Sequence, residues 1–116
     1  METLSQRLCR LLESAARQHQ TITYRALAEQ ADIPAPQSIR RLTELLETMI
    51  RSDHDQGINP SLACLAVSQT NPAIPRAGYF MLLNELGLYQ GANEGNEAEA
   101  FHQQQLQQLF ERYSAS

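Results

Sequence analysis

The chain has 116 residues, of which 42% are hydrophobic and 19% are charged, and its formal net charge is -4. This length allows one hydrophobic core and excludes two independent ones, and the apolar share is that of a folded globular protein. The charge excludes a protein whose whole surface neutralises phosphates, so any contact with nucleic acid must be local.

The first predicted element is an amphipathic helix from Leu4 to about Gln18. Apolar residues recur there every three or four positions, with charged residues between them. A short β-branched segment follows at Thr21-Ile22-Thr23, with room for one brief strand. Thr23 is also a good N-cap, and the next apolar residues fit a two-turn helix that begins at Tyr24. The start of the chain is therefore expected to be helix, strand and helix.

Two prolines separate that second helix from a longer one. Pro34 and Pro36 end the helix that begins at Tyr24, because a proline lacks a backbone donor and biases the preceding residue to an extended conformation. The longer helix is expected to open at Pro36 or Gln37. Its apolar stripe consists of Ile39, Leu42, Leu45, Leu46, Met49 and Ile50. Two helices across a tight turn are typical of a helix-turn-helix.

A β-hairpin is predicted after the longer helix. Residues 62–67 form an apolar run of strand length with no polar residue on either face, which indicates a buried strand. A loop rich in turn residues covers 69–78, and Gly78-Tyr79-Phe80 is expected to return as the second strand. The two strands and their loop would form the wing of a winged helix. A short helix over residues 80–86 is expected to follow.

The C-terminal segment is expected to be a linker followed by one helix. Residues 91–96 are rich in Gly and Asn, and residues 97–113 carry an apolar helical stripe. Its solvent face is expected to hold Gln103, Gln104, Gln105, Gln107 and Gln108. Residues 1–90 would then be a winged-helix-like domain, with the linker and helix of residues 91–116 packed on it. The predicted fold class is α+β, mostly α: a winged helix-turn-helix-like domain with a small β-hairpin wing and a C-terminal helical extension.

The expected compartment is the cytoplasm. No run of residues approaches the ~20 apolar residues that a membrane span requires, and the first residues lack a basic segment followed by an apolar one. The two cysteines, Cys9 and Cys64, lack close ligand spacing and fall at apolar positions, which favours reduced core thiols. Asp53-His54-Asp55 is better explained as a solvated helix end than as a metal site. We expect no metal, no cofactor and no membrane partner.

The opening residues of the longer helix are the candidate contacts to double-stranded DNA. A recognition helix places its N-terminal residues in the major groove, where glutamine pairs with adenine and arginine with guanine or phosphate. These residues are Gln37, Ser38, Arg40 and Arg41. Arg25 and Arg76 are expected to add contacts to the DNA backbone. The alternative is a solvated helix face that carries Glu44 and Glu47 beside the arginines.

Part of this pattern resembles a known family. The run Thr21-Ile22-Thr23-Tyr24-Arg25-Ala26-Leu27-Ala28, the proline turn, Ile39-Arg40-Arg41-Leu42 and Asn59-Pro60 resemble the DNA-binding domain of the alkylguanine-DNA alkyltransferases and their alkyltransferase-like relatives. The resemblance covers roughly half of the chain. It implies that Tyr24 touches the DNA backbone. It also implies that Arg40, or Arg41 if the register slips by one, fills the gap left by a flipped base.

The chain departs from that family where the family's chemistry lies. The reactive Pro-Cys-His-Arg motif should fall near Ala66-Val67-Ser68-Gln69 and is missing. Cys64 lies close by but has no adjacent histidine, and its apolar run should raise the pKa of its thiol. The sequence also contains no set of acid, base and nucleophile at an interpretable spacing, so we expect a protein that is not an enzyme.

A second hypothesis is a protein-protein interaction module that acts as an adaptor or as a subunit of a larger complex. The net negative charge of the chain favours it, and aromatic residues dominate the energetics of many interfaces. The candidate anchors are Tyr79, Phe80, Phe101, Phe110 and Tyr113, whose alternative role is to close the core. A third expectation is a homodimer formed through the glutamine-faced last helix.

Overall fold

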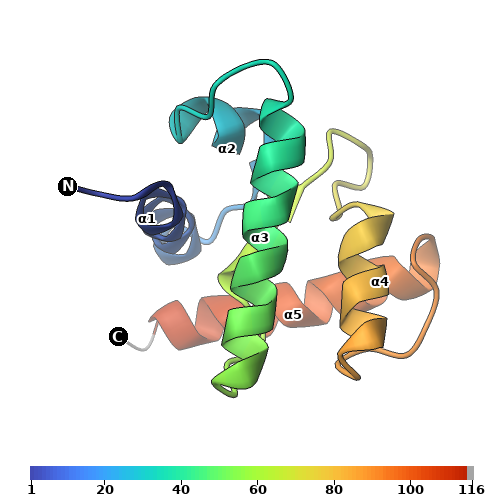
Figure 1. Cartoon of the computed structure of the whole chain (residues 1–116). Helices are drawn as coiled ribbons and strands as arrows, with labels where there is room; N and C mark the ends of the chain where they lie inside the picture. Colours follow the sequence, from blue (N-terminus) through green and yellow to red (C-terminus); the bar gives the residue numbers. More distant parts are fainter. Residues whose placement is uncertain (115–116) are drawn as a thin grey trace.

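The computed structural model describes residues 1–114, and five helices make up most of it (Figure 1). A small two-stranded sheet accompanies them, so the predicted class, α+β and mostly α, is confirmed. In Figure 1, α3 runs through the middle, with α1 and α2 on one side, α4 on the other, and α5 crossing behind. In chain order the elements are α1 Leu4–Arg17, β1 Ile22–Thr23, α2 Tyr24–Gln30, α3 Ser38–Asp55, the 3-10 helix η1 Leu62–Leu65, β2 Ala66–Val67, α4 Ala77–Glu85 and α5 Asn96–Ser114.

Threonine caps fix the starts of α1 and α2. The side chain of Thr3 accepts from the backbone N–H of Gln6, whose side chain accepts from the N–H of Thr3 in return, so the two form a capping box. Thr23 Oγ1 accepts from the backbone N–H of Ala26 at 3.1 Å, which confirms the predicted N-cap. Each cap satisfies backbone donors that have no partner within the helix.

The predicted hairpin wing is wrong. Residues 62–67 are buried as expected, but only Ala66–Val67 is a strand, and it follows the 3-10 helix η1. This strand pairs in parallel with β1, in the register Ile22↔Ala66 and Thr23↔Val67, instead of with a returning strand. Where the sequence suggested a wing, residues 68–76 form a loop in which the N–H of Ser68 donates to the carbonyl of Ile74 at 2.9 Å.

The expected second strand, Gly78-Tyr79-Phe80, lies inside helix α4. A strand would point Tyr79 and Phe80 to opposite faces, whereas the helix places both of them, with Leu82 and Leu83, against the core. Helix is therefore the conformation that buries the larger apolar area. The helix expected over residues 80–86 is present, and it begins three residues earlier, at Ala77.

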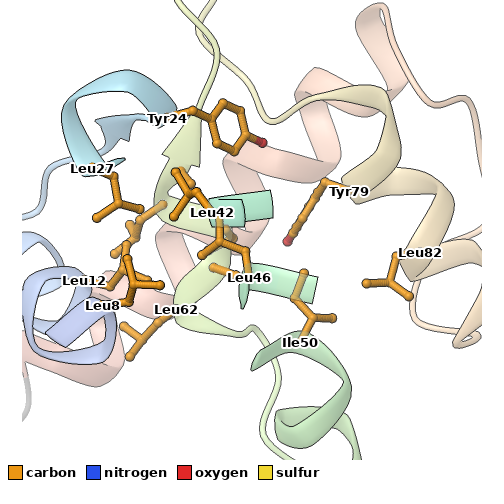
Figure 2. Close-up of a cluster of buried hydrophobic side chains, with 14 of the residues drawn as sticks. Leu8, Leu12, Tyr24, Leu27, Leu42, Leu46, Ile50, Leu62, Tyr79 and Leu82 are labelled. Atoms are coloured by element: carbon orange, nitrogen blue, oxygen red, sulfur yellow. The ribbon is translucent and has the colours of Figure 1, made fainter. Parts of the chain in front are cut away.

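One hydrophobic core joins the five helices and η1. Helix α3 contributes Leu42, Leu46 and Ile50, and these side chains lie between leucines of α1 and α2 on one side and Tyr79 and Leu82 of α4 on the other (Figure 2). Helix α5 adds Ala98, Leu106 and Leu109 to the same cluster. Among residues 1–114, no helix has the length and apolar character needed to cross a membrane.

Polar contacts also attach α5 to the rest of the protein. The hydroxyl of Tyr79 donates to Oε1 of Gln105 at 2.7 Å, and Nη2 of Arg112 donates to the carbonyl of Pro60 at 2.9 Å. Gln105 is buried, so its predicted place on the solvent face is wrong, whereas Gln103, Gln104, Gln107 and Gln108 are exposed. Gln105 is buried because it supplies the acceptor that the buried hydroxyl of Tyr79 requires.

His102 gives the fold a dependence on pH. Its side chain is fully buried, and Nε2 lies 2.8 Å from the carbonyl oxygen of Cys64. Because a carbonyl only accepts, Nε2 must carry the proton, while Nδ1 has no hydrogen-bond partner among residues 1–114. Burial lowers the pKa of His102 below its ordinary value of 6.5. The folded protein therefore keeps this ring neutral while the unfolded chain takes up a proton.

We expect the free energy of unfolding to fall as the pH falls below about 6.5, by at most about 1.4 kcal/mol per pH unit from this group. Urea unfolding between pH 7.5 and pH 5.5 measures the slope. His102→Gln keeps a donor near the carbonyl of Cys64 but cannot take up a proton, so its slope is expected to be smaller than that of the parent. Equal slopes in the two proteins would contradict this assignment.

Candidate nucleic-acid interface

The turn between α2 and α3 forms a well-defined corner. The N–H of Ile33 donates to the carbonyl of Ala28 at 3.1 Å and closes α2, and the side chain of Ile33 is buried beneath the turn. Nη1 of Arg7, on α1, donates to the carbonyl of Ala31 at 2.8 Å and ties the corner to the first helix. The predicted helix-turn-helix order is present, and α3 begins at Ser38.

Gln37 holds an uncommon backbone conformation at the start of α3. Its φ of 64° lies in the left-handed region, and as the N-cap residue it makes no side-chain capping hydrogen bond. Non-glycine residues seldom adopt this region, and such strain is concentrated at functional sites. The Gln37 side chain is exposed at the corner, beside the first turn of α3.

The structure divides the predicted DNA contacts between two adjacent hollows. A groove of about 580 Å³, here called the Tyr24 groove, is lined by α2, the turn, the start of α3 and the loop after β2. It brings together Tyr24, Arg25, Ser38 and Arg76. A second hollow, of about 520 Å³, is lined by the prolines of the turn and by Gln37, Arg40 and Arg41. Ile33 lines both, so the two hollows flank one corner.

Tyr24 and Arg76 form a unit inside the Tyr24 groove. The hydroxyl of Tyr24 accepts from the backbone N–H of Arg76 at 3.0 Å, and the Arg76 guanidinium lies 4.9 Å from the centre of the Tyr24 ring. The ring is buried, and burial raises the pKa of Tyr24 above its ordinary value. Tyr24 thus fixes the end of the 68–76 loop and the position of the Arg76 side chain.

Replacing Tyr24 with phenylalanine is expected to lower the free energy of unfolding by about 1 kcal/mol, because the Arg76 N–H loses its acceptor. Amide hydrogen exchange at Arg76 should accelerate more than exchange in α1, since the change frees the loop end locally. Nuclear magnetic resonance measures both quantities. An unchanged exchange rate at Arg76 would show that the hydroxyl does not hold this loop.

The arginines of the corner are exposed and only weakly paired. Glu44 lies 3.5 Å from Nε of Arg40 and 3.8 Å from Nη1 of Arg41, and the two arginine side chains are 74% and 58% exposed. Arg25 pairs with Glu29 in the same way, at 3.4 Å. Exposed ion pairs of this kind contribute at most about 1 kcal/mol, so a phosphate can replace the carboxylate.

Positive and negative charges balance at the corner, although the protein as a whole is acidic. Its arginines are Arg25, Arg40, Arg41 and Arg76, and its carboxylates are Glu29, Asp32, Glu44 and Glu47, the last of which lines one cavity with Arg76. The local balance is zero, against -4 for the whole chain. Two guanidinium groups share the one carboxylate of Glu44, which leaves hydrogen-bond donors of Arg40 and Arg41 for a ligand.

The aromatic residues proposed as anchors for a partner protein divide into two groups. Tyr79 and Phe80 lie in the core and are not available at the surface, because α4 turns both inward. Phe101, Phe110 and Tyr113 are half-buried on α5. Phe101 stacks on Tyr89 with ring centres 4.3 Å apart, Phe110 stacks on His19 at 5.0 Å, and the guanidinium of Arg17 lies 5.9 Å from the Tyr113 ring.

The cysteines are thiols at neutral pH. Burial raises the pKa of Cys64 to about 12 and that of Cys9 to about 11. The His102 ring contacts the carbonyl of Cys64, so this contact cannot deprotonate the sulfur. Within residues 1–114, no group of three or more His, Cys, Asp or Glu side chains is arranged to hold a metal ion.

A small cavity behind Tyr24 was not predicted from the sequence. This space of about 130 Å³ lies between α3 and α4, and Tyr24, Glu47, Arg76 and Tyr79 are among the residues that line it. Sequence reasoning missed it because it depends on α4 being a helix that faces α3.

Comparison of the chain with known protein families, with curated proteins and with solved structures finds no match.

Proposed function

We propose that this protein is a non-catalytic DNA-binding protein of the winged-helix type, with α3 as its recognition helix and the 68–76 loop in the place of a hairpin wing. One observation carries the proposal: Arg40 and Arg41 are exposed in the first turn of a helix that a tight turn holds against α2. The N-terminal turn of the second helix is the part that enters the major groove in this class of protein.

Each residue of the corner then has a role in the proposed complex. Arg40, Arg41 and Gln37 contact base edges or adjacent phosphates, and the positive end of the α3 dipole adds to their attraction for phosphate. Arg25 and Arg76 contact the DNA backbone on the side of the Tyr24 groove. Tyr24 accepts one hydrogen bond from the loop, and its hydroxyl proton is the group that would reach a phosphate. The resemblance to the alkyltransferase-like proteins supports the roles of Tyr24 and Arg40.

The charge of the protein sets the expected strength of binding. About three or four arginines are placed to replace counterions on DNA, which predicts a slope of roughly -3 for the logarithm of the association constant against the logarithm of salt concentration. The acidic remainder of the surface repels DNA and limits binding outside the corner. Binding is therefore expected to be local and to weaken steeply with salt.

A salt titration of duplex binding tests the proposal. Fluorescence anisotropy with a labelled duplex of about 20 base pairs is expected to give a dissociation constant in the micromolar range or below at low salt, with the slope stated above. Absence of binding at low salt would refute the function. A slope near zero would show that the arginines do not contact phosphates.

An interaction module is the second candidate, and the half-buried aromatic residues of α5 favour it. Phe101, Phe110 and Tyr113 remain partly accessible on an acidic protein, as anchors of an interface should be. A photo-crosslinking residue at Gln103, on the exposed side of α5, is expected to capture another protein in cells. The same residue at Arg10, on α1, serves as the control. A specific crosslink together with no duplex binding would favour this function over the first.

A further inference from the structure

The loop between β2 and α4, residues 68–76, is fixed at both ends. The N–H of Ser68 donates to the carbonyl of Ile74 at 2.9 Å, and the N–H of Arg76 donates to the hydroxyl of Tyr24 at 3.0 Å. In Figure 1 this loop and the α2–α3 turn lie at the same end of the molecule. The loop is therefore a defined surface feature next to the candidate nucleic-acid interface.

The tip of this loop is exposed and uncharged. Every residue from 69 to 73 is exposed, and residues 68–75 include no charged side chain. Oγ1 of Thr70 donates to the carbonyl of Pro72 at 2.9 Å, and the proline ring fixes its own φ angle, so the tip is also constrained. A constrained tip loses little conformational entropy when it binds a ligand.

Two side-chain amides are available on the tip, those of Gln69 and Asn71. Both residues are exposed, and neither amide has a hydrogen-bond partner among residues 1–114. An uncharged amide gains less from a phosphate than an arginine does, and the neighbouring arginines already offer donors for phosphates. Base edges in the grooves of DNA, in contrast, are neutral donors and acceptors. The chemistry of the tip therefore suits base edges better than the DNA backbone.

The Tyr24 groove determines which groove of the DNA the tip meets. Ser38 at the start of α3 and Gln69 of the loop both line it, together with Arg25 and Arg76. In the proposed complex the two arginines hold the backbone of one DNA strand here, with α3 on one side of the strand and the loop on the other. A backbone strand separates the major groove from the minor groove. With the first turn of α3 in the major groove, the tip of the loop therefore faces the minor groove.

We propose that the 68–76 loop reads A·T base pairs in the minor groove, with Gln69 and Asn71 as the specificity-determining residues. In the minor groove, A·T and T·A pairs present only acceptors, which match the amide N–H donors. Guanine adds an amino group there, which is itself a donor and opposes them. Asparagine and glutamine serve this readout in proteins that bind the minor groove. The inference rests on the proposed DNA-binding function and adds the base preference of the loop.

A pair of duplexes isolates the contact in the minor groove. The base of inosine is guanine without that amino group. Alternating inosine–cytosine and guanine–cytosine duplexes of about 20 base pairs therefore share the major-groove acceptors that α3 meets and differ in the minor groove. Fluorescence anisotropy at low salt is expected to give an affinity for the inosine duplex about fivefold or more above that for the guanine duplex.

Two matched variants locate the source of this ratio of affinities. The double variant Gln69→Ala and Asn71→Ala removes both amides of the tip and is expected to bring the ratio to within about twofold of one. Its control, Gln103→Ala with Gln108→Ala, removes two exposed amides from α5 and should keep the ratio of the parent. All four side chains are exposed, so the fold should not change, and circular dichroism checks this.

A parent protein that binds neither duplex refutes the proposed function and, with it, this inference. Equal affinity for the two duplexes leaves that function standing and overturns the minor-groove contact. A ratio that persists without the amides of the tip also overturns the proposal, because another part of the protein then senses the amino group. Loss of the ratio in both variants overturns it as well. Loss of the ratio in the loop variant alone supports it.

Discussion

Replacement of Phe80 with alanine is expected to lower the free energy of unfolding by about 3–5 kcal/mol. The Phe80 side chain has no exposed surface, meets Tyr79 edge-to-face with ring centres 5.2 Å apart, and lies 5.8 Å from the ring of Tyr89. Its removal leaves a cavity where α4 packs against the rest of the core, and aromatic contacts are lost in addition to buried area. Urea unfolding followed by circular dichroism measures the effect.

Met81 provides the matched control, because it is the next residue on α4 and is 58% exposed. Met81→Ala should change the free energy of unfolding by no more than about 0.5 kcal/mol. If Phe80→Ala lowers the free energy of unfolding no more than Met81→Ala does, the core position of Phe80 is contradicted. That result would also restore the hypothesis that this residue is an anchor for a partner protein.

The double substitution Arg40→Gln and Arg41→Gln is expected to weaken duplex binding by about 10- to 100-fold at low salt. Each arginine that contacts a phosphate should also reduce the magnitude of the salt slope by about one when it is removed. A loss of affinity with an unchanged slope would instead indicate contacts to base edges, since these contacts release few counterions. Both side chains are largely exposed, so the fold should not change.

Arg51 is the control for this experiment because it lies on the same helix, near the opposite end. It is exposed and pairs with Glu85 of α4 at 2.9 Å. Arg51→Gln makes the same change in charge and should leave binding within about twofold, as expected for a charge far from the contact. If Arg51→Gln and the double variant weaken binding equally for each charge removed, the interaction is a general electrostatic one, and the α2–α3 corner is not the site.

The sequence predicted the helices at both ends of the chain and the central turn because their signals are local. Thr23 is an N-cap wherever its hydroxyl can reach the backbone N–H of Ala26, three residues later. The apolar spacing of residues 4–18 and 97–113 defines helix faces whatever lies opposite them. The prolines at 34 and 36 separate α2 from α3 because a proline ring fixes its own φ angle and removes the backbone N–H donor. The arginines of the candidate DNA interface were found in the same way, as the first turn of a predicted helix.

Only the tertiary structure decided the elements whose local signals are ambiguous. An apolar run such as residues 62–67 fits a strand or a helix, and the partner of Ala66 turned out to be Ile22, more than forty positions earlier. Tyr79 and Phe80 lie in a helix, and in that conformation the core buries both rings. Gln105 and His102 became buried because Tyr79 and the carbonyl of Cys64 required partners. The secondary structure and burial of these residues depend on groups far apart in the chain, so they cannot be predicted from local sequence patterns.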